Sequence, residues 1–447
     1  MKNNVKSAVA ITLTGIILLS TSTIKLNREK KYNGLTTTTS ISLEQKSNNL
    51  NSIYSKKYSP EANELIGYTI NKLEENYEKM QLIYNDYELP EKEKFIDDFM
   101  KTIVNNINEI EIVDSYTNSD YSNMLENDLE QAFVQDGLLL INNDLSMEEQ
   151  AENLIHGIFH FSQKNIINSD KENLNIELGM YNILTEGDSS WYSNFINSSN
   201  FSTSVSVVSS NNKICYMKGL GGGNYSKYSR AYNMLINLVG YSNMQMCKEN
   251  YDKKILIETI NNKYNIDGEK FIDNLNQICT FDEVSIDSIA VVENMYIECL
   301  EQELLNTNSK EDLLNFFNKY RAYRLQFRIS CSENGEDVTN EVFNFESIDT
   351  LLLQKLNDYQ LLPKGYEKII YNLCLLNLPN QICENESASI YDINYYIEDN
   401  EIVLLNKTTE TMEKYNTINN VVEYYEIDNL ALEKSTPLIS NYLEKSL

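Results

Sequence analysis

The sequence predicts a mainly α-helical (α+β) protein with a short strand in front of a central helix and a small α/β region at the C-terminus. Between residues 59 and 330, apolar residues recur at intervals of three and four, the period of a helix with one buried face. The short apolar run 137–141 interrupts this pattern and is typical of a buried strand. Beyond residue 390, two strand-like runs flank Glu398-Asp399-Asn400 and indicate a hairpin.

The composition excludes several classes of function. The 447 residues include 66 Asp and Glu against 37 Lys and Arg, a formal net charge of −29. Such a surface repels the phosphates of nucleic acids and anionic lipid headgroups, so we expect no nucleic-acid partner. Seven cysteines without a C-x-x-C pair indicate neither a zinc ribbon nor a thioredoxin-like motif. Their wide spacing argues against a disulfide framework.

Residues 1–26 have the pattern of a targeting segment. Lys2 and Lys6 precede an uncharged, mostly apolar run from Ala8 to Ile24. This pattern is typical of a bacterial signal peptide or of an N-terminal membrane anchor, and the sequence leaves both open. The lack of an A-x-A cleavage site favours a retained anchor, whereas the basic residues after the run oppose the positive-inside rule. We therefore expect an exported protein at the cell surface, either membrane-anchored or secreted.

Three further regions follow the targeting segment. Residues 27–58 are polar and Thr-rich, which predicts a disordered linker. We assign residues 59–330 to one helical domain and residues 331–447 to a C-terminal α/β appendage. The first helix is expected at Ser59-Pro60-Glu61, because serine is a good N-cap and proline fits the first helical turn. A second helix, from about Pro90, has an apolar stripe at spacings of four: Phe95, Phe99, Ile103 and Ile107.

The later part of the helical domain contains one expected loop and one unusual basic strip. Residues 197–213 are rich in Ser and Asn and, with the glycines that follow, predict a loop. A helix expected at about residues 310–329 contains Arg321, Arg324 and Arg328. In so acidic a chain, we expect these arginines to pair with the protein's own carboxylates.

The only two histidines of the chain, His156 and His160, lie four residues apart. Ser146-Met147-Glu148-Glu149 is a capping box that predicts the start of their helix. On a helix this spacing places both imidazoles on one face, about one turn apart, where they can bind one metal ion. The alternative is a pair of partly buried histidines that find hydrogen-bond partners and bind no metal.

A third ligand is available further along the chain, in a second expected helix from about Lys171 to Ile196. This helix contains Leu184-Thr185-Glu186-Gly187. Glu186 would complete a His156, His160 and Glu186 metal site, which suits zinc and leaves its fourth position open. The alternative for Glu186 is a solvated helix carboxylate. Asp188 is a candidate partner for a histidine ring nitrogen.

These residues resemble the gluzincin metallopeptidases, whose zinc helix reads H-E-x-x-H and whose third ligand is a glutamate on a following helix, often in an L-x-E-G context. The resemblance covers about residues 135–280. It implies a zincin-like helical core, a zinc cofactor, and a zinc helix packed beneath an edge strand that holds extended peptide. It also implies that a tyrosine of the next helix, Tyr225, Tyr228 or Tyr232, approaches a metal-bound oxyanion.

The motif departs from that family at one position. Gly157 stands where the family has the glutamate that takes a proton from the zinc-bound water and passes it to the leaving amine. We therefore expect a zinc metallopeptidase-like protein that binds metal and a peptide or protein ligand but is catalytically degenerate. No catalytic residue is assigned. The alternative is a metal-free cell-surface binding or structural protein.

Overall fold

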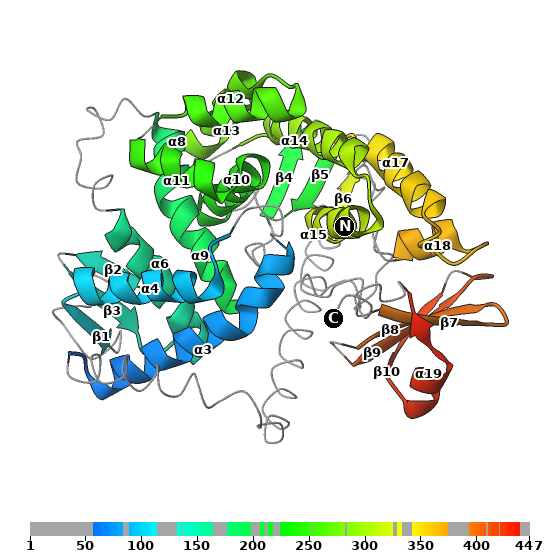
Figure 1. Cartoon of the computed structure of the whole chain (residues 1–447), viewed down its shortest axis with the longest axis horizontal. Coiled ribbons are helices and arrows are strands. Elements are labelled where there is room, and N and C mark those ends of the chain that lie inside the picture. Colours follow the sequence, from blue (N-terminus) through cyan, green and yellow to red (C-terminus); the bar gives the residue numbers. More distant parts are fainter. Residues whose placement is uncertain are drawn as a thin grey trace, which may run out of the picture. The chain divides into compact units, whose positions relative to one another are not determined.

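The structure, a computed structural model, describes residues 57–83, 89–113, 132–135, 137–163, 177–197, 206–210, 213–217, 224–250, 252–281, 284–324, 329–332, 342–373, 393–407, 410–419 and 421–438. These residues are mainly helical and add three small sheets, which confirms the predicted fold class (Figure 1). The chain divides into residues 1–57 and a unit that begins at Tyr58. The predicted targeting segment lies outside the described residues, as does the predicted linker except for its last two residues. Within the described ranges, no helix combines the length and apolar character needed to cross a bilayer.

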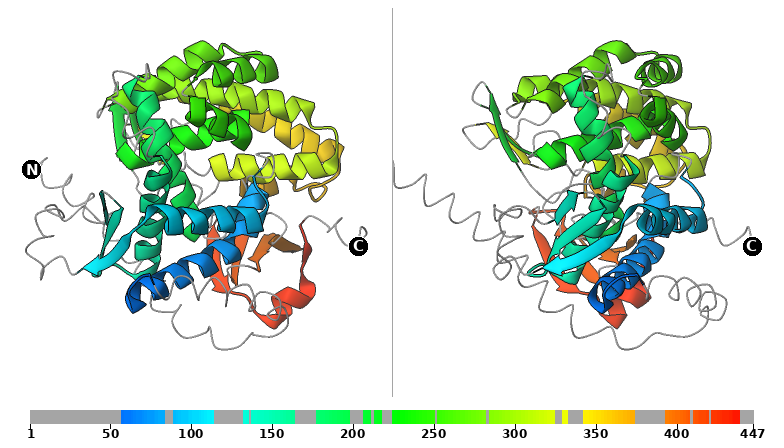
Figure 2. Two further views of the ribbon diagram at one scale, coloured as in Figure 1. Left: turned by 60° about the vertical axis from the view of Figure 1, so that its left-hand side comes forward. Right: turned by 90° about the vertical axis from the view of Figure 1, so that its left-hand side faces the viewer.

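Helices α3 (Pro60–Ile83) and α4 (Lys92–Asn106) begin this unit where the sequence predicts them. Ser59 caps α3, because its hydroxyl accepts a hydrogen bond from the backbone N–H of Ala62 (3.1 Å). The apolar stripe of α4 is buried at all four positions. Tyr58 joins the two helices through its hydroxyl, which lies 2.9 Å from the carbonyl oxygen of Ile107. Figures 1 and 2 show the helices side by side.

A three-stranded sheet precedes the helix that carries both histidines. Its strand order is β1-β3-β2 (Glu109–Val113, Leu138–Asn142 and Ala132–Gln135), with β1 parallel and β2 antiparallel to β3. The predicted buried strand corresponds to β3, in which residues 139–141 have no exposed surface. Helix α6 (Met147–Ser162) follows and packs against β2 and β3. The sheet therefore supports α6 from one side.

The second helix of the site differs from the continuous α-helix predicted from Lys171 to Ile196. Its described part consists of α8 (Leu178–Asn182), a π-helical turn η3 (Ile183–Gly187) and α9 (Asp188–Asn197), and residues 171–176 lie outside the described residues. A π-helical turn adds one residue to a single turn. Apolar periodicity does not reveal so local an insertion, because packing against neighbouring helices decides it.

Helix α10 (Asn224–Val239) lies among several other helices. Every side chain from Ala231 to Val239 is buried. The helix contacts η3, α9, α11 (Tyr241–Asn250), α12 (Lys254–Tyr264) and α13 (Gly268–Thr280). It therefore forms the core against which the π-helical turn packs.

The predicted loop at residues 197–213 is wrong for its described part. Strand β4 (Ser206–Ser210) pairs antiparallel with β5 (Lys213–Met217), which pairs with β6 (Ile329–Ser332). Of the two ladder partners of β5, β4 is adjacent in the chain, but β6 comes from a segment more than a hundred residues away, and local composition does not reveal that pairing. β6 spans the predicted domain boundary at residue 330, so this sheet joins residues of both predicted domains.

Helices α14 (Ile286–Asn306), α15 (Lys310–Arg324) and α17 (Phe345–Asp358) pack against one another. The guanidinium of Arg324 lies 3.4 Å from the carboxylate of Asp349 in α17, which confirms the predicted pairing for this arginine. Arg321 is buried, and Arg328 lies outside the described residues.

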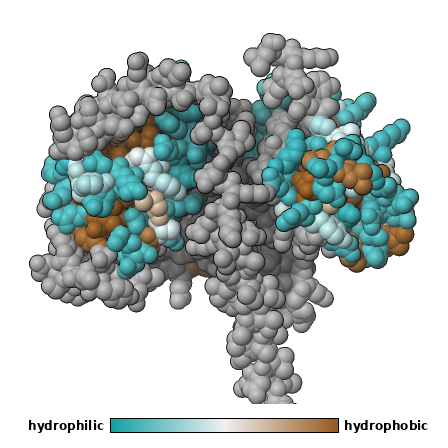
Figure 3. Space-filling view, turned by 90° about the horizontal axis from the view of Figure 1, so that it is seen from below, coloured by the Kyte–Doolittle hydropathy of each residue, from teal (hydrophilic) through white to brown (hydrophobic). Residues whose placement is uncertain are grey.

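The last described part is a five-stranded antiparallel sheet of order β10-β9-β8-β7-β11, preceded by the short helix α18 (Glu367–Tyr371). The predicted hairpin is formed by β7 and β8. Helix α19 (Asn429–Lys434) covers the sheet through Ala431, which packs in an apolar cluster with Val403, Leu405 and Met412. The strands are β7 (Ile393–Glu398), β8 (Glu401–Asn406), β9 (Thr411–Asn416), β10 (Val422–Glu426) and β11 (Thr436–Pro437). On the face seen in Figure 3, hydrophilic residues predominate around smaller hydrophobic patches.

Candidate metal centre

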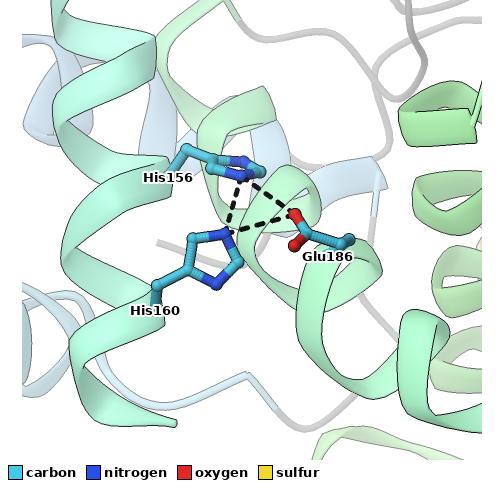
Figure 4. A group of neighbouring side chains, drawn as sticks. All are labelled: His156, His160 and Glu186. Atoms are coloured by element: carbon cyan, nitrogen blue, oxygen red, sulfur yellow. Dashed lines mark hydrogen bonds and ion pairs between the residues drawn. The ribbon is translucent and has the colours of Figure 1, made fainter. Parts of the chain in front are cut away.

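Helix α6 places both histidines on one face, as their spacing predicts. The predicted capping box is present: the Ser146 hydroxyl accepts from the backbone N–H of Glu149 (3.3 Å), and the Glu149 carboxylate accepts from the backbone N–H of Ser146 (2.9 Å). The two Nε2 atoms of His156 and His160 lie 2.9 Å apart, with the rings edge to face (Figure 4). One turn of α6 therefore presents two ring nitrogens to the same point.

Glu186 reaches that point from the π-helical turn η3. Its Oε2 atom lies 3.3 Å from Nε2 of His156 and 3.2 Å from Nε2 of His160 (Figure 4). Helices α6 and α9 pack against each other, which brings the two parts of the site together. The structure thus unites all three residues that the sequence singles out as candidate ligands.

The triangle of ligand atoms fits a metal ion. At zinc bond lengths of about 2.0–2.1 Å and tetrahedral angles, ligand atoms lie about 3.4 Å apart. The observed separations of 2.9–3.3 Å are slightly shorter. Oε2 of Glu186 is buried, and its described neighbours are the two imidazole nitrogens of the triangle. Two ring nitrogens and a carboxylate oxygen that converge in this way can hold a metal ion.

Electrostatics favours the protonation states that metal ligands need. Burial raises the pKa of Glu186, but the two imidazoles outweigh it and hold that pKa well below its usual range. Burial lowers the pKa of His156. Burial also lowers the pKa of His160, yet the adjacent Glu186 outweighs it and leaves this pKa raised. The ionised carboxylate of Glu186 and the neutral imidazole of His156 can bind a metal ion without releasing a proton. His160 stays protonated to a higher pH and must release that proton before it can bind the metal.

The site retains access to solvent. The side chains of His156, His160 and Glu186 are 23%, 13% and 32% exposed. Three protein ligands with this access leave room for a further ligand from solution. Among the described residues, no fourth Asp, Glu, Cys or His joins the group. In particular, Gly157 contributes no carboxylate.

The ring nitrogens that point away from the triangle have partners that the sequence did not indicate. Nδ1 of His160 lies 3.0 Å from Oε1 of Gln163, and Nδ1 of His156 lies 3.5 Å from Oγ of Ser190. Asp188, the predicted partner of a histidine, instead accepts a hydrogen bond from Nε2 of Gln163 (2.7 Å). Gln163 was not predicted, although its position three residues after His160 on the helix is a signal for such a contact.

The tyrosines proposed from the resemblance have other neighbours in the structure. The hydroxyl of Tyr228 accepts a hydrogen bond from the side-chain amide of Asn182 (3.2 Å). Tyr232 is fully buried, and burial together with the nearby Asp188 raises its pKa well above the ordinary value. The side chain of Tyr225 lies outside the described residues.

Comparison of the chain with protein-family models, curated proteins and solved structures returned no match in any of the three. The geometry of this site is therefore the main indication of function.

Proposed function

We propose that the chain is a zinc metallopeptidase-like protein in which His156, His160 and Glu186 hold the zinc ion. The observation that carries the proposal is the triangle of two Nε2 atoms and one carboxylate oxygen, 2.9–3.3 Å apart. Imidazole and carboxylate are ordinary zinc ligands, and three of them leave a fourth position open.

The chain's own residues support binding better than hydrolysis. A zinc ion at such a site supplies a Lewis acid for a carbonyl oxygen and acidifies a bound water. Gly157 has no side chain that could accept or deliver a proton, and Asp188 has no exposed surface. We therefore propose that the protein binds metal and a peptide or protein ligand with weak or no hydrolytic activity.

Strand β2 supports a peptide as the ligand. It forms one edge of the sheet β1-β3-β2 and packs against α6. The outer edge of such a strand presents backbone N–H and C=O groups that can pair with an extended chain.

We further propose that the protein is exported and tethered to the membrane through residues 1–26. The uncharged, apolar run behind two lysines supports this proposal. Recovery of the intact chain in the membrane fraction is expected. A chain lacking residues 1–26 in the medium would instead identify a cleaved signal peptide.

Metal analysis of the purified full-length protein, produced without a histidine tag and dialysed after exposure to zinc, tests the metal site. We expect one zinc per chain and its loss in His156→Ala. Glu152→Ala, a change one turn earlier on α6, is the matched control and should retain the metal. Wild-type protein that holds no metal after this treatment would refute the proposal and favour a metal-free surface binding or structural protein.

A further inference from the structure

A chain of buried polar contacts runs from the candidate metal centre to helix α11. Nδ1 of His160 lies 3.0 Å from Oε1 of Gln163, and Nε2 of Gln163 donates to Oδ2 of Asp188 at 2.7 Å. The ammonium group of Lys248, on α11, donates to the same oxygen at 2.6 Å. Gln163 and Asp188 are 2% and 0% exposed, so water does not compete for the contact between them.

The surroundings of Gln163 fix the orientation of its amide. Its Nε2 atom donates to the carbonyl oxygen of Thr185 (3.1 Å) as well as to Asp188. A third neighbour, the hydroxyl of Ser189, lies 3.3 Å away and can donate or accept. The carbonyl of Thr185 and the carboxylate of Asp188 only accept, so a flipped amide would place its oxygen against two other oxygens. The carbonyl oxygen of Gln163 must therefore face His160.

This orientation selects one tautomer of His160. An amide oxygen only accepts hydrogen bonds, so Nδ1 of the neutral imidazole must carry the proton. Nε2 then has the lone pair, and Nε2 is the atom that lies 2.9 Å from Nε2 of His156, which can donate to it, and 3.2 Å from Oε2 of Glu186 in the ligand triangle. The hydrogen-bond chain thus prepares the nitrogen that a metal needs.

We propose that Lys248 is a positioning residue for the metal site, which acts through Asp188 and Gln163 to set the metal-binding tautomer of His160. The proposal rests on the proposed function, because it concerns the same site. Asp188 is the only link between Lys248 and Gln163 among the contacts described here, and a buried carboxylate needs a cation to remain in place. Without the ammonium group, Asp188 no longer holds the Gln163 amide in its orientation.

The test uses the full-length protein labelled with ¹⁵N-histidine, because two histidines give only four ring-nitrogen signals. In the metal-free wild type, at a pH where both imidazoles are neutral, we expect the His160 proton on Nδ1. In Lys248→Met, we expect part of this proton population to move to Nε2. We expect the zinc affinity of that variant to fall by about 10–100-fold, the usual effect of removing such a partner.

Three other variants separate positioning from general structural effects. Lys248→Arg keeps the cation and should retain the wild-type tautomer and zinc affinity. Lys253→Met removes a lysine paired with Glu177 and Asp273 at the surface, away from this chain of contacts, and should also match the wild type. Gln163→Leu keeps the Lys248 and Asp188 pair but removes the acceptor, so it should reproduce the tautomer shift.

Equal tautomer populations and zinc affinities in Lys248→Met and Lys253→Met would overturn the proposal. If Lys248→Met does not fold, the tautomer measured in the metal-free wild type still tests the proposal. A His160 proton found on Nε2 there would overturn it as well. Failure of the proposed function is a separate result: the wild type would bind no zinc, whatever the tautomer spectrum shows.

Discussion

Gly187 lies so close to helix α10 that a Cβ at this position would stand 2.5 Å from the carbonyl oxygen of Tyr228. It would also stand 3.0 Å from the Cβ of Tyr232. Gly187 directly follows the candidate ligand Glu186, so this close approach fixes the π-helical turn against the core helix and fixes the carboxylate with it. The glycine after the ligand therefore has a packing role.

We predict that Gly187→Ala lowers both stability and zinc affinity. The added methyl group must displace the backbone of α10 or the turn itself, at a cost of about 1–3 kcal/mol. The movement would also shift Glu186 away from His156 and His160. Thermal unfolding and zinc titration of the purified protein measure the two effects.

The matched control for that substitution is Gly67→Ala in helix α3. A Cβ there meets no atom within 4 Å, so alanine should raise stability by up to about 1 kcal/mol through its better helix propensity. If both substitutions changed stability equally, the close packing of Gly187 would not be what fixes the turn.

Gly157→Glu introduces the glutamate that the gluzincin motif has at this position and is expected to produce peptide hydrolysis that a chelator abolishes. A positioned general base contributes about 10²–10⁴-fold to such reactions. Cleavage of a mixed peptide library, with and without chelator, measures it. Gly157→Gln, which has the same shape without a basic carboxylate, should stay as inactive as the wild type. A zinc-loaded Gly157→Glu protein without activity would show that more than the base is missing.

Zinc should stabilise the protein more at pH 8 than at pH 6. A ligand imidazole must be neutral, and the raised pKa of His160 extends proton competition to higher pH. In the metal-free protein, His160 has the opposite effect on how stability changes with pH. Its raised pKa stabilises the folded state below the unfolded pKa of about 6.5, and this stabilisation is lost as the pH rises through the pKa of the folded state. The lowered pKa of Glu186 contributes stability above about 4.5 and changes little across this range.

Thermal unfolding with and without zinc at several pH values checks this expectation. The zinc-dependent rise in Tm should grow with pH in the wild type. His156→Ala should show no rise at any pH. An equal rise at pH 6 and pH 8 in the wild type would exclude the histidines as ligands.

Glu293→Ala is expected to destabilise the protein by about 3–5 kcal/mol. Glu293 of α14 pairs with Arg230 of α10 at 3.0 Å, and the two side chains are 1% and 2% exposed. The substitution leaves the guanidinium buried without its carboxylate, although it still lies against the ring of Tyr323. Chemical denaturation measures the loss. Glu75→Ala, which breaks the exposed pair with Lys72, should cost less than about 1 kcal/mol.

Much of the candidate site could be predicted because its signals are local. The four-residue spacing of His156 and His160 and the capping box at Ser146 depend only on helix geometry. The π-helical turn at Glu186 and the contact of Gln163 with His160 were not predicted. The turn is decided by packing against α10, and the contact by how Thr185 and Asp188 orient the Gln163 amide.

The amino-acid sequence alone was sufficient for the mainly helical fold class, for the buried strand before α6 and for the identity of the three candidate ligands. The fold class, the strand and the histidine pair follow from the spacing of residues within a short segment, whereas Glu186 is what the resemblance implies, through its place in Leu184-Thr185-Glu186-Gly187 after that pair. The tertiary structure decided that Glu186 meets the histidines, that Asp188 contacts Gln163 and not a histidine, and that β5 pairs with β6. These features depend on contacts between segments far apart in the chain, and local periodicity holds no information about which distant groups become neighbours.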